Sequence, residues 1–199
     1  IEVVNPEDDP RYRDCWEDYQ RLMGREGVTP SMAKAALRRS NTLISAMLMR
    51  RGDADAMLCG LVGSFDVHLE HIRNSIGLRS GASTFATMNA VLLDDRTLFL
   101  ADTFVNEEPS AEQLAEIAAM AVDELRRFGV PPRVAFVSHS MFGSSKRPAA
   151  RRMRHAADLF KRSRPGVPCD GEMHGDAALS AEIRHNFLPD STLEGEANL

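Results

Sequence analysis

The sequence predicts an α/β fold whose sheet is largely parallel, and three observations support this fold class. Short apolar segments typical of strands alternate along the chain with segments whose apolar residues recur at helical spacing. The segment 133–138, RVAFVS, is such a strand candidate and lies between two helical segments, as parallel strands covered by helices do. The chain has 199 residues, of which 43% are hydrophobic, so it can form one substantial core or two smaller lobes that share a cleft.

The first part of the chain is predicted to be mainly helical. Apolar residues recur at helical spacing over 11–23, and the glycine-bearing segment 24–27 ends that pattern. Thr29 followed by Pro30 predicts the next helix start, because Thr is a favoured N-cap and Pro fits the first helical position. Helical segments are expected to continue to Arg51.

A strand is predicted where the helical pattern stops. The segment 54–63, ADAMLCGLVG, is typical of a short buried strand that leads into a glycine-bearing loop. A helix is expected from about Asp66 to Ile76. The character of the chain changes after Gly77, so we expect a subdomain boundary near residue 78.

The second part begins with a predicted strand pair. The segments 83–93 and 97–105 are separated only by Asp94-Asp95-Arg96, which is typical of a tight turn between strands.

A capping box opens the clearest helix of the chain. The Ser110 hydroxyl can accept the Gln113 backbone N–H while the Gln113 side chain reaches back. The apolar stripe that follows extends to Phe128, and Gly129 is expected to end the helix. The strand 133–138 comes next, then a serine-rich loop and a helix to about Arg162.

Composition excludes several function classes. No apolar run approaches the roughly 18 residues that span a bilayer, and the first residues lack the pattern of a secretory signal, which favours the cytoplasm. The three cysteines are far apart and without CxxC spacing, so neither a disulfide framework nor a zinc ribbon is indicated. A net charge of -5 argues against global attraction to nucleic acid.

The serine-rich loop is the strongest candidate binding site. The stretch 137–148, VSHSMFGSSKRP, follows a predicted strand and precedes a helix, the position where α/β sheets bind ligands. Small residues, hydroxyls and free N–H groups at a helix start favour a phosphate or another anion. Basic residues dominate the segment that follows, at Lys146, Arg147, Arg151, Arg152, Arg154, Lys161, Arg162 and Arg164.

The alternative interpretation is structural. The serines can satisfy the unpaired donors of the helix start, while the basic residues form a solvated face. The loop matches neither GxxxxGK[ST] nor GxGxxG. A nucleophilic serine is disfavoured, because Ser138 and His139 are neighbours at a strand end and the Gly-x-Ser-x-Gly elbow is missing.

Other polar groups are weaker candidates. His68 and His71 are one helical turn apart and could ligate a metal, but no third ligand has suitable spacing. Asp170, Glu172 and Asp176 could be acid/base groups or metal ligands, although a turn followed by a helix cap explains them equally well. Asp102 could point into a cleft or cap a turn.

The two ends of the sequence suggest a fragment. The chain opens with Ile1, and its last residues, GEANL, contain an apolar stretch that is only starting. We therefore expect a larger parent polypeptide.

Taken in order, these segments resemble the phosphate acetyl/butyryl transferase family, most closely the version fused to the C-terminus of large bacterial NAD(P)-dependent malic enzymes. The similarity covers almost the whole chain in the expected order. The residues that carry it are RRGDADAMLCG (50–60), TLFLADTFVNEEPSAEQLAEIA (97–118), VSHSMFGSSKRPAARRMR (137–154), DGEMHGDAAL (170–179) and GEANL (195–199).

This resemblance implies a three-layer α/β/α fold of two lobes, similar to isocitrate and isopropylmalate dehydrogenases. Residues 1–78 would belong to the first lobe and 79–199 to a second lobe truncated at its C-terminus. Acetyl-CoA or CoA would bind in the cleft between them. The implied binding residues are Gly63, Ser64, Phe65, His68, Asp102, Ser138, Ser140, Gly143, Ser144, Ser145 and Lys146.

The resemblance also implies that transfer chemistry is absent. Active transferases hold phosphate with arginines and serine donors, and two of these arginines align with Met23 and Glu70 here. The remaining catalytic residues of the family lie in a segment beyond this chain. The implied function is regulation by acetyl-CoA and oligomer assembly, while a missing module with NAD(P) and a divalent metal converts malate to pyruvate. The alternative is an active phosphate acetyltransferase.

Overall fold

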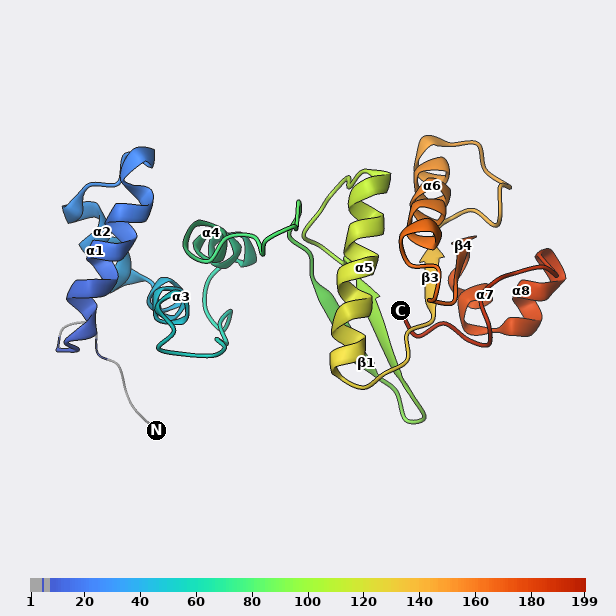
Figure 1. Ribbon diagram of the computed structural model, residues 1–199, viewed down its shortest axis with the longest axis horizontal. Helices are drawn as coiled ribbons and strands as arrows, with labels where there is room; N and C mark the ends of the chain where they lie inside the picture. The colour runs from blue at the N-terminus through green and yellow to red at the C-terminus, as the bar shows by residue number, and fades with distance from the viewer. Residues whose placement is uncertain (1–4, 6–7) are drawn as a thin grey trace. The chain divides into compact units, whose positions relative to one another are not determined.

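The computed structural model describes residue 5 and residues 8–199 of the chain. The chain forms two compact units, one that ends at Ser80 and one over Gly81–Leu199 (Figure 1). Each unit buries its own apolar residues. None of the helices in the described residues is long and apolar enough to cross a membrane.

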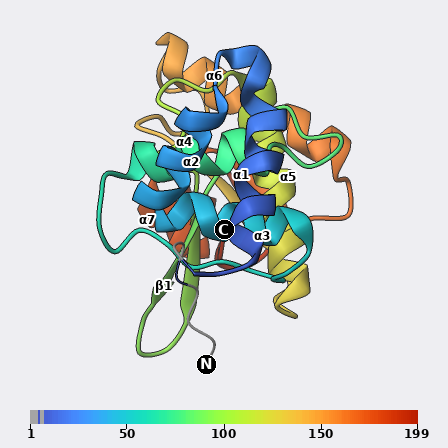
Figure 2. The same cartoon turned by 90° about the vertical axis from the view of Figure 1, so that its left-hand side faces the viewer.

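In its described residues, the first unit is built from helices alone. These are α1 (Arg11–Met23), the short 3-10 helix η1 (Gly24–Glu26), α2 (Pro30–Arg39), α3 (Asn41–Arg51) and α4 (Phe65–Ser75). The predicted start at Thr29 is confirmed, since its side chain accepts the Met32 N–H. Helices α1, α2 and α3 lie against one another (Figures 1 and 2). Their shared core contains Cys15, Tyr19, Ala33, Leu37, Leu43 and Met47.

The predicted strand over 54–63 is wrong. The segment has no strand structure, and Leu58 and Leu61 are almost completely exposed, at 101% and 99%. An apolar run becomes a strand only where another strand pairs with its backbone, and the described residues of this unit contain none. Gly60 and Gly63 also have positive φ angles of 109° and 110°, which interrupt an extended backbone.

The second unit contains all the described strands. The elements are β1 (Met88–Leu92), β2 (Thr97–Ala101), α5 (Ala111–Arg127), β3 (Val134–Val137), α6 (Pro148–Ser163), β4 (Cys169–Met173), α7 (Gly175–Leu179) and α8 (Ala181–Phe187). β1 and β2 pair antiparallel, and β3 pairs parallel with β4. Only one of the two strand pairs is therefore parallel, although the sequence predicted a largely parallel sheet. Helices α5 and α6 lie side by side (Figure 1).

Several predictions for this unit are confirmed. The strand pair around 94–96 forms, although both strands are shorter than predicted. The capping box at Ser110 and Gln113 is complete. Gly129 follows the helix with a φ of 75°. The core between α5, α6 and the sheet includes Val122, Val134, Phe136, Phe160 and Cys169.

The last residues of the chain lie between β2 and β3. Phe99 N–H donates to Asn198 C=O at 2.8 Å on one side, and Ala135 N–H donates to Leu199 C=O at 2.8 Å on the other. Leu199 N–H donates to Arg133 C=O at 3.1 Å, so Leu199 pairs with β3 in the parallel pattern. The two strand pairs are thus joined at one end by a segment that arrives from far along the chain.

The side chains of Arg184 and Asn198 hold this final segment in place. Arg184 is completely buried, and its guanidinium donates to the carbonyls of Ala177, Leu193 and Gly195. Burial lowers the pKa of Arg184 from its ordinary value. The Asn198 side chain accepts the Arg133 N–H and donates to Pro131 C=O. These hydrogen bonds to main-chain groups fix the path of residues 193–198.

Candidate functional site

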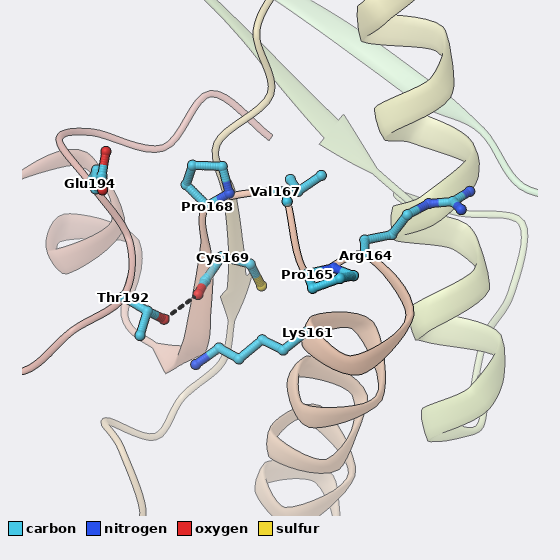
Figure 3. A pocket seen from close by; sticks show the side chains of 9 residues that line it. Lys161, Arg164, Pro165, Val167, Pro168, Cys169, Thr192 and Glu194 are labelled. Atoms are coloured by element: carbon cyan, nitrogen blue, oxygen red, sulfur yellow. Dashed lines mark hydrogen bonds between the residues drawn. The ribbon is translucent and has the colours of Figure 1, made fainter.

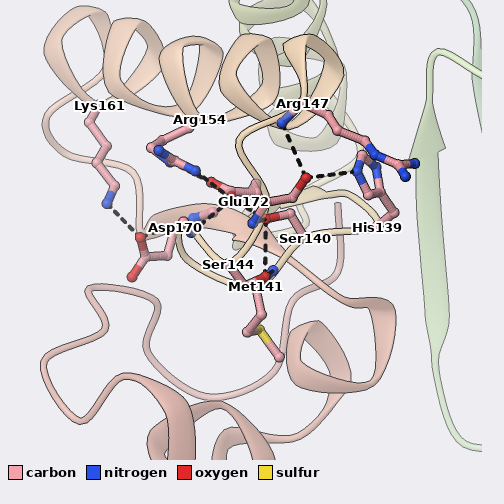
Figure 4. A network of polar contacts seen from close by, with 12 residues as sticks. His139, Ser140, Met141, Ser144, Arg147, Arg154, Lys161, Asp170 and Glu172 are labelled. Atoms are coloured by element: carbon pink, nitrogen blue, oxygen red, sulfur yellow. Dashed lines mark hydrogen bonds and ion pairs between the residues drawn. The ribbon is translucent and has the colours of Figure 1, made fainter.

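The serine-rich loop is built around a buried carboxylate. The loop leaves the end of β3 and enters α6, as predicted, and Glu172 of β4 lies beneath it with 0% exposure (Figure 4). Ser140 Oγ donates to Glu172 Oε1 at 2.6 Å, and Gly143 N–H donates to the same oxygen at 2.9 Å. Arg154 of α6 donates through Nε and Nη2 at 2.8 and 2.9 Å. One carboxylate therefore joins β4, the loop and α6.

This arrangement keeps Glu172 ionised. Burial alone would raise the pKa of Glu172, but hydrogen bonds from Arg154, Ser140 and the Gly143 N–H lower it to about 2. A buried carboxylate is stable only when such partners replace its lost hydration. Glu172 thus acts as a fixed negative charge that organises the loop.

The hydroxyl oxygens of Ser140 and Ser144 also accept N–H groups of the loop itself. Ser145 N–H donates to Ser140 Oγ at 3.0 Å, and Met141 N–H donates to Ser144 Oγ at 2.9 Å. Between them the chain turns through Phe142 and Gly143, whose φ angles are 41° and 96°. Only glycine adopts such an angle without strain, so Gly143 is required by backbone conformation.

The outward face of the loop carries the groups that could meet a ligand. His139, Gly143, Ser144 and Lys146 are exposed, whereas Ser140 is completely buried. Arg147 and Arg151 at the start of α6 are also exposed. The N-terminus of this helix adds its partial positive charge. The face can bind an anion through Ser144, Lys146 and these arginines.

Several of the predicted basic residues have another role. Arg154 forms an ion pair with Glu172. Lys161 pairs with Asp170 at 2.6 Å, and Arg164 pairs with Asp123 at 3.2 Å. Ion pairs of this kind position a helix and leave less charge for a ligand. The cationic surface is accordingly concentrated at the start of α6.

Asp102 organises the loop after β2. Its carboxylate accepts the Thr87 N–H and hydroxyl, the Val105 N–H, and two donors of Asn106. Burial would raise the pKa of Asp102, but the hydrogen bonds from Thr87 and Asn106 hold it below its ordinary value. The structure shows the turn-capping role considered for Asp102, and Asp102 also lines a groove between β2 and β3.

The remaining predicted residues lie in the first unit. Ser64 is the N-cap residue of α4, Phe65 is its first residue, and His68 lies one turn later. His68 Nδ1 is 2.7 Å from Thr42 Oγ1. A Cβ placed on Gly63 would be 3.1 Å from His68 Nε2, so this glycine allows the ring to approach the main chain. Proximity between this group and the serine-rich loop stays a prediction.

Asp170 and Glu172 do not lie in the turn that the sequence offered as their alternative explanation. Asp170 and Glu172 are both buried on β4, a strand that the sequence did not predict. Asp170 accepts Lys161, the Ser191 hydroxyl and the Thr192 N–H, so it holds the segment that leads to the C-terminus. Asp176 is exposed in the first turn of α7. The sequence singled out Glu172 as a possible acid/base group or metal ligand but missed its role as the support of the loop, because its partner Ser140 is 32 residues away and no local pattern joins them.

The cavities among the described residues of the second unit include two beside its strands. One of about 410 Å³ is at the other end of β4 from the serine-rich loop, lined by Lys161, Pro165, Pro168 and Cys169 among others (Figure 3). Burial raises the pKa of the Cys169 thiol to about 12, so it is not a nucleophile. The other, of about 340 Å³, is an apolar groove between β2 and β3. Asp102 and Val137 line the apolar groove, whereas none of residues 138–148 lines either cavity. Within the described residues, no three His, Cys, Asp or Glu side chains gather to hold a metal.

Comparisons with known proteins cover the whole chain. The model of the family described as phosphate acetyl/butaryl transferase matches residues 1–199. The chain is 49% identical over all 199 residues to an NADP-dependent malic enzyme of Escherichia coli, where the match spans 26% of that protein. It is 30% identical over 199 residues to a phosphate acetyltransferase of Nitratidesulfovibrio vulgaris, across 28% of that protein.

A solved structure shows the same fold. A phosphotransacetylase from Streptococcus pyogenes superimposes with a TM-score of 0.86 and 28% sequence identity. The superposition covers 98% of this chain and 60% of that chain. The α/β architecture described above is therefore that of the phosphotransacetylases, as the sequence predicted.

Proposed function

Because the chain belongs to the phosphate acetyl/butaryl transferase family, we propose that it is a regulatory domain of a larger malic enzyme, where it binds acetyl-CoA and supplies oligomer contacts. The observation that carries this proposal is the pattern of similarity. Identity to a malic enzyme is 49% over the full chain, against 30% to a phosphate acetyltransferase.

The chain spans about a quarter of the length of the malic enzyme that it matches. We propose that a separate catalytic module of the same cytoplasmic protein oxidises and decarboxylates malate to pyruvate, with NAD(P) and a divalent metal. Regulation then requires acetyl-CoA to bind one state of the assembly better than another. A coupling free energy of about 1–3 kcal/mol is typical of such effectors.

The outward face of the serine-rich loop fits a phosphorylated ligand. Ser144 offers a hydroxyl, and Lys146, Arg147 and Arg151 offer cationic groups around the start of α6. Ser140 acts indirectly, because its hydroxyl is buried and donates to Glu172. The buried network gives the loop a fixed shape before any ligand arrives, which reduces the entropy lost on binding.

The proposed loss of transferase chemistry depends on two positions. Met23 lies at the end of α1, and Glu70 is exposed on α4. By the family resemblance, we propose that both stand where active transferases have phosphate-binding arginines. One lost charge-assisted hydrogen bond weakens binding by roughly 1.5–3 kcal/mol, and a carboxylate adds repulsion toward phosphate.

Titration calorimetry of the full protein with acetyl-CoA tests the regulatory proposal. We expect measurable heat and a higher melting temperature. Replacing Lys146 by Glu should weaken binding about tenfold, because it reverses a charge beside the phosphates. Arg162→Glu is the matched control, since Arg162 is an exposed cation at the far end of α6. Absence of heat and of any melting shift at millimolar acetyl-CoA would remove the proposal.

The second candidate function is an active phosphate acetyltransferase, favoured by the family match itself. Formation of acetyl phosphate from acetyl-CoA and phosphate distinguishes the two. We expect no turnover above background from the full protein. Turnover at ordinary enzyme rates, on the order of 1–1000 per second, would establish the alternative.

A further inference from the structure

His139 is an exposed histidine within the serine-rich loop. Its Nε2 lies 3.3 Å from Ser145 Oγ, and either atom can donate in this contact. The hydrogen bonds that hold Glu172 come from other groups of the loop and from Arg154. His139 lies at the outer edge of this polar network in Figure 4. The imidazole is therefore not needed to support the loop and is available to a ligand at its surface.

The surface around the start of α6 is cationic. Lys146, Arg147 and Arg151 are exposed, and none of them forms an ion pair with another described residue. Such a group of cations attracts anions. Lysine and arginine keep their charge between about pH 5.5 and pH 8, whereas histidine is the side chain that changes its charge in this range. His139 is therefore the group of this face whose charge can follow the pH.

The hydroxyl of Ser145 couples the ring to the loop. Ser145 Oγ accepts the Arg147 N–H at 3.3 Å, and the Ser145 N–H donates to Ser140 Oγ at 3.0 Å. A neutral ring with its proton on Nδ1 accepts the Ser145 O–H through Nε2. When a proton from solvent binds to Nε2, the ring becomes the donor and the Ser145 O–H turns away from it. Protonation therefore adds a positive charge and releases a hydroxyl donor in one step.

Other charged groups near the loop are held by partners of their own. Glu172 beneath the loop is ionised, because its pKa is lowered to about 2, and it pairs with Arg154. Asp102 after β2 accepts hydrogen bonds from Thr87 and Asn106 that keep its pKa below the ordinary value. The exposed titratable groups on neighbouring elements are His155 of α6, and His174 and Asp176 around the start of α7.

His174 is the main competitor for a role in pH dependence. It directly follows β4, which pairs in parallel with β3, so both histidines lie at the carboxyl end of the same strand pair. His155 is further along α6, where it interacts with Glu112 of α5. Variants of these two residues can therefore separate an effect of His139 from that of any nearby histidine.

We propose that His139 is a proton-dependent part of the anion-binding face, so that this loop takes up a proton when it binds a phosphate or another oxyanion. The anion accepts from the imidazolium and from the Ser145 O–H, beside Lys146 and Arg147. These cations disfavour a further positive charge until an anion is bound, which couples protonation to binding. The inference rests on the anion-binding face of the proposed function and adds a pH-dependent regulation of that face.

Calorimetric titration of the full protein with sulfate tests this coupling. Sulfate keeps its charge between about pH 5.5 and pH 8, whereas a phosphate ester titrates near pH 6. We expect sulfate to bind about tenfold more tightly at the lower pH, because one positive charge is added beside it. Titrations at an intermediate pH in two cationic buffers of different ionisation enthalpy should show net proton uptake.

Substitutions assign the effect to the ring and to the hydroxyl. His139→Gln keeps a polar contact with Ser145 but cannot gain a charge, so the ratio of the two affinities should fall below about twofold. Ser145→Ala keeps the charge and loses the hydroxyl donor, so a ratio of about threefold is expected. His174→Gln and His155→Gln are the matched controls and should keep the tenfold ratio. Melting temperatures check that every variant is folded.

Several results would overturn the inference. These are equal sulfate affinity at both pH values, no sulfate binding at millimolar concentration, a tenfold ratio that persists in His139→Gln, or a ratio lost in His174→Gln instead. A tenfold ratio that persists in Ser145→Ala would overturn the hydroxyl step. Acetyl-CoA binding without any pH effect on sulfate would remove this inference and leave the proposed function. The tenfold ratio without acetyl-CoA binding would support this inference and remove the proposed function.

Discussion

Two glycine-containing loops of this chain lie at apolar runs, yet one is held by buried contacts and the other is exposed to solvent. The loop over 138–146 is held by the buried carboxylate of Glu172, which accepts four hydrogen bonds from the loop and from Arg154. The loop over 54–63 has no such centre, and Leu58 and Leu61 are exposed to solvent. The difference comes from the neighbours of each run. The run before 138–146 pairs with β4, whereas the run at 54–63 has no strand beside it in the described part of its unit. An apolar run therefore predicts structure only together with its partner.

Thiol labelling should show the largest contrast between the two regions. Cys59 of the 54–63 loop is exposed, while Cys169 at the start of β4 is buried and its pKa is raised to about 12. We expect Cys59 to react with a neutral alkylating reagent at least about 1000-fold faster than Cys169, which can react only when its region opens. Mass spectrometry after timed quenching measures both rates. Comparable rates in the native protein, with all three thiols equal in denaturant, would show that β4 is not a stable strand.

Replacing the carboxylate at the centre of the serine-rich loop should strongly destabilise the protein. Glu172→Gln removes the charge that pairs with Arg154, and we expect a loss of about 3 kcal/mol in the free energy of unfolding. Chemical denaturation followed by circular dichroism measures it. Glu182→Gln is the matched control, because Glu182 is exposed on α8. A loss as small as that of the control would mean that the buried network does not stabilise the loop.

The same carboxylate should make stability depend on pH. The folded pKa of Glu172 is lowered to about 2, below its unfolded value, so its contribution is present above that unfolded value and is lost as the pH falls toward 2. We expect a loss of roughly 2 kcal/mol between pH 5 and pH 2, measured by denaturation at each pH. Glu172→Gln should remove this part of the slope. An unchanged slope in the variant would assign the effect to other groups.

The smallest effect is expected in the exposed loop. Leu61→Ser changes a side chain that is 99% exposed, and the free energy of unfolding should change by less than about 0.5 kcal/mol. Phe136→Ala gives the contrast, because Phe136 is buried against Phe160 and its truncation should cost about 3 kcal/mol or more. A large loss for Leu61→Ser would show that the 54–63 segment is packed in solution.

Local signals account for the parts that the sequence predicted well. The helix start at Thr29-Pro30 and the capping box at Ser110 depend on residues within three positions, so they are visible without the fold. The turn at 94–96 joins strands whose register follows from it. The position of the serine-rich loop could be predicted because β3, the loop and α6 follow one another directly in the sequence.

The missed parts depend on distant contacts. β4 carries Asp170 and Glu172, and buried charges are not typical of a strand core. They are tolerated there because Lys161, Arg154 and Ser140 reach them from other elements. The role of Ser140 as a support of the loop, and the exposure of Ser144, follow from the same arrangement. A single sequence gives no signal for such pairs.

The position of the C-terminal segment has a consequence for the order of folding. The β1–β2 turn and helix α5 are made of neighbours in sequence and can form early. Arg133 N–H donates to the side chain of Asn198, which is 65 residues later, so the two strand pairs can be joined there only after residue 198 has been made. During synthesis at about 5–20 residues per second, the inner edges of β2 and β3 stay open for several seconds until that residue is made. Within that interval the nascent chain is most exposed to mispairing with other strands.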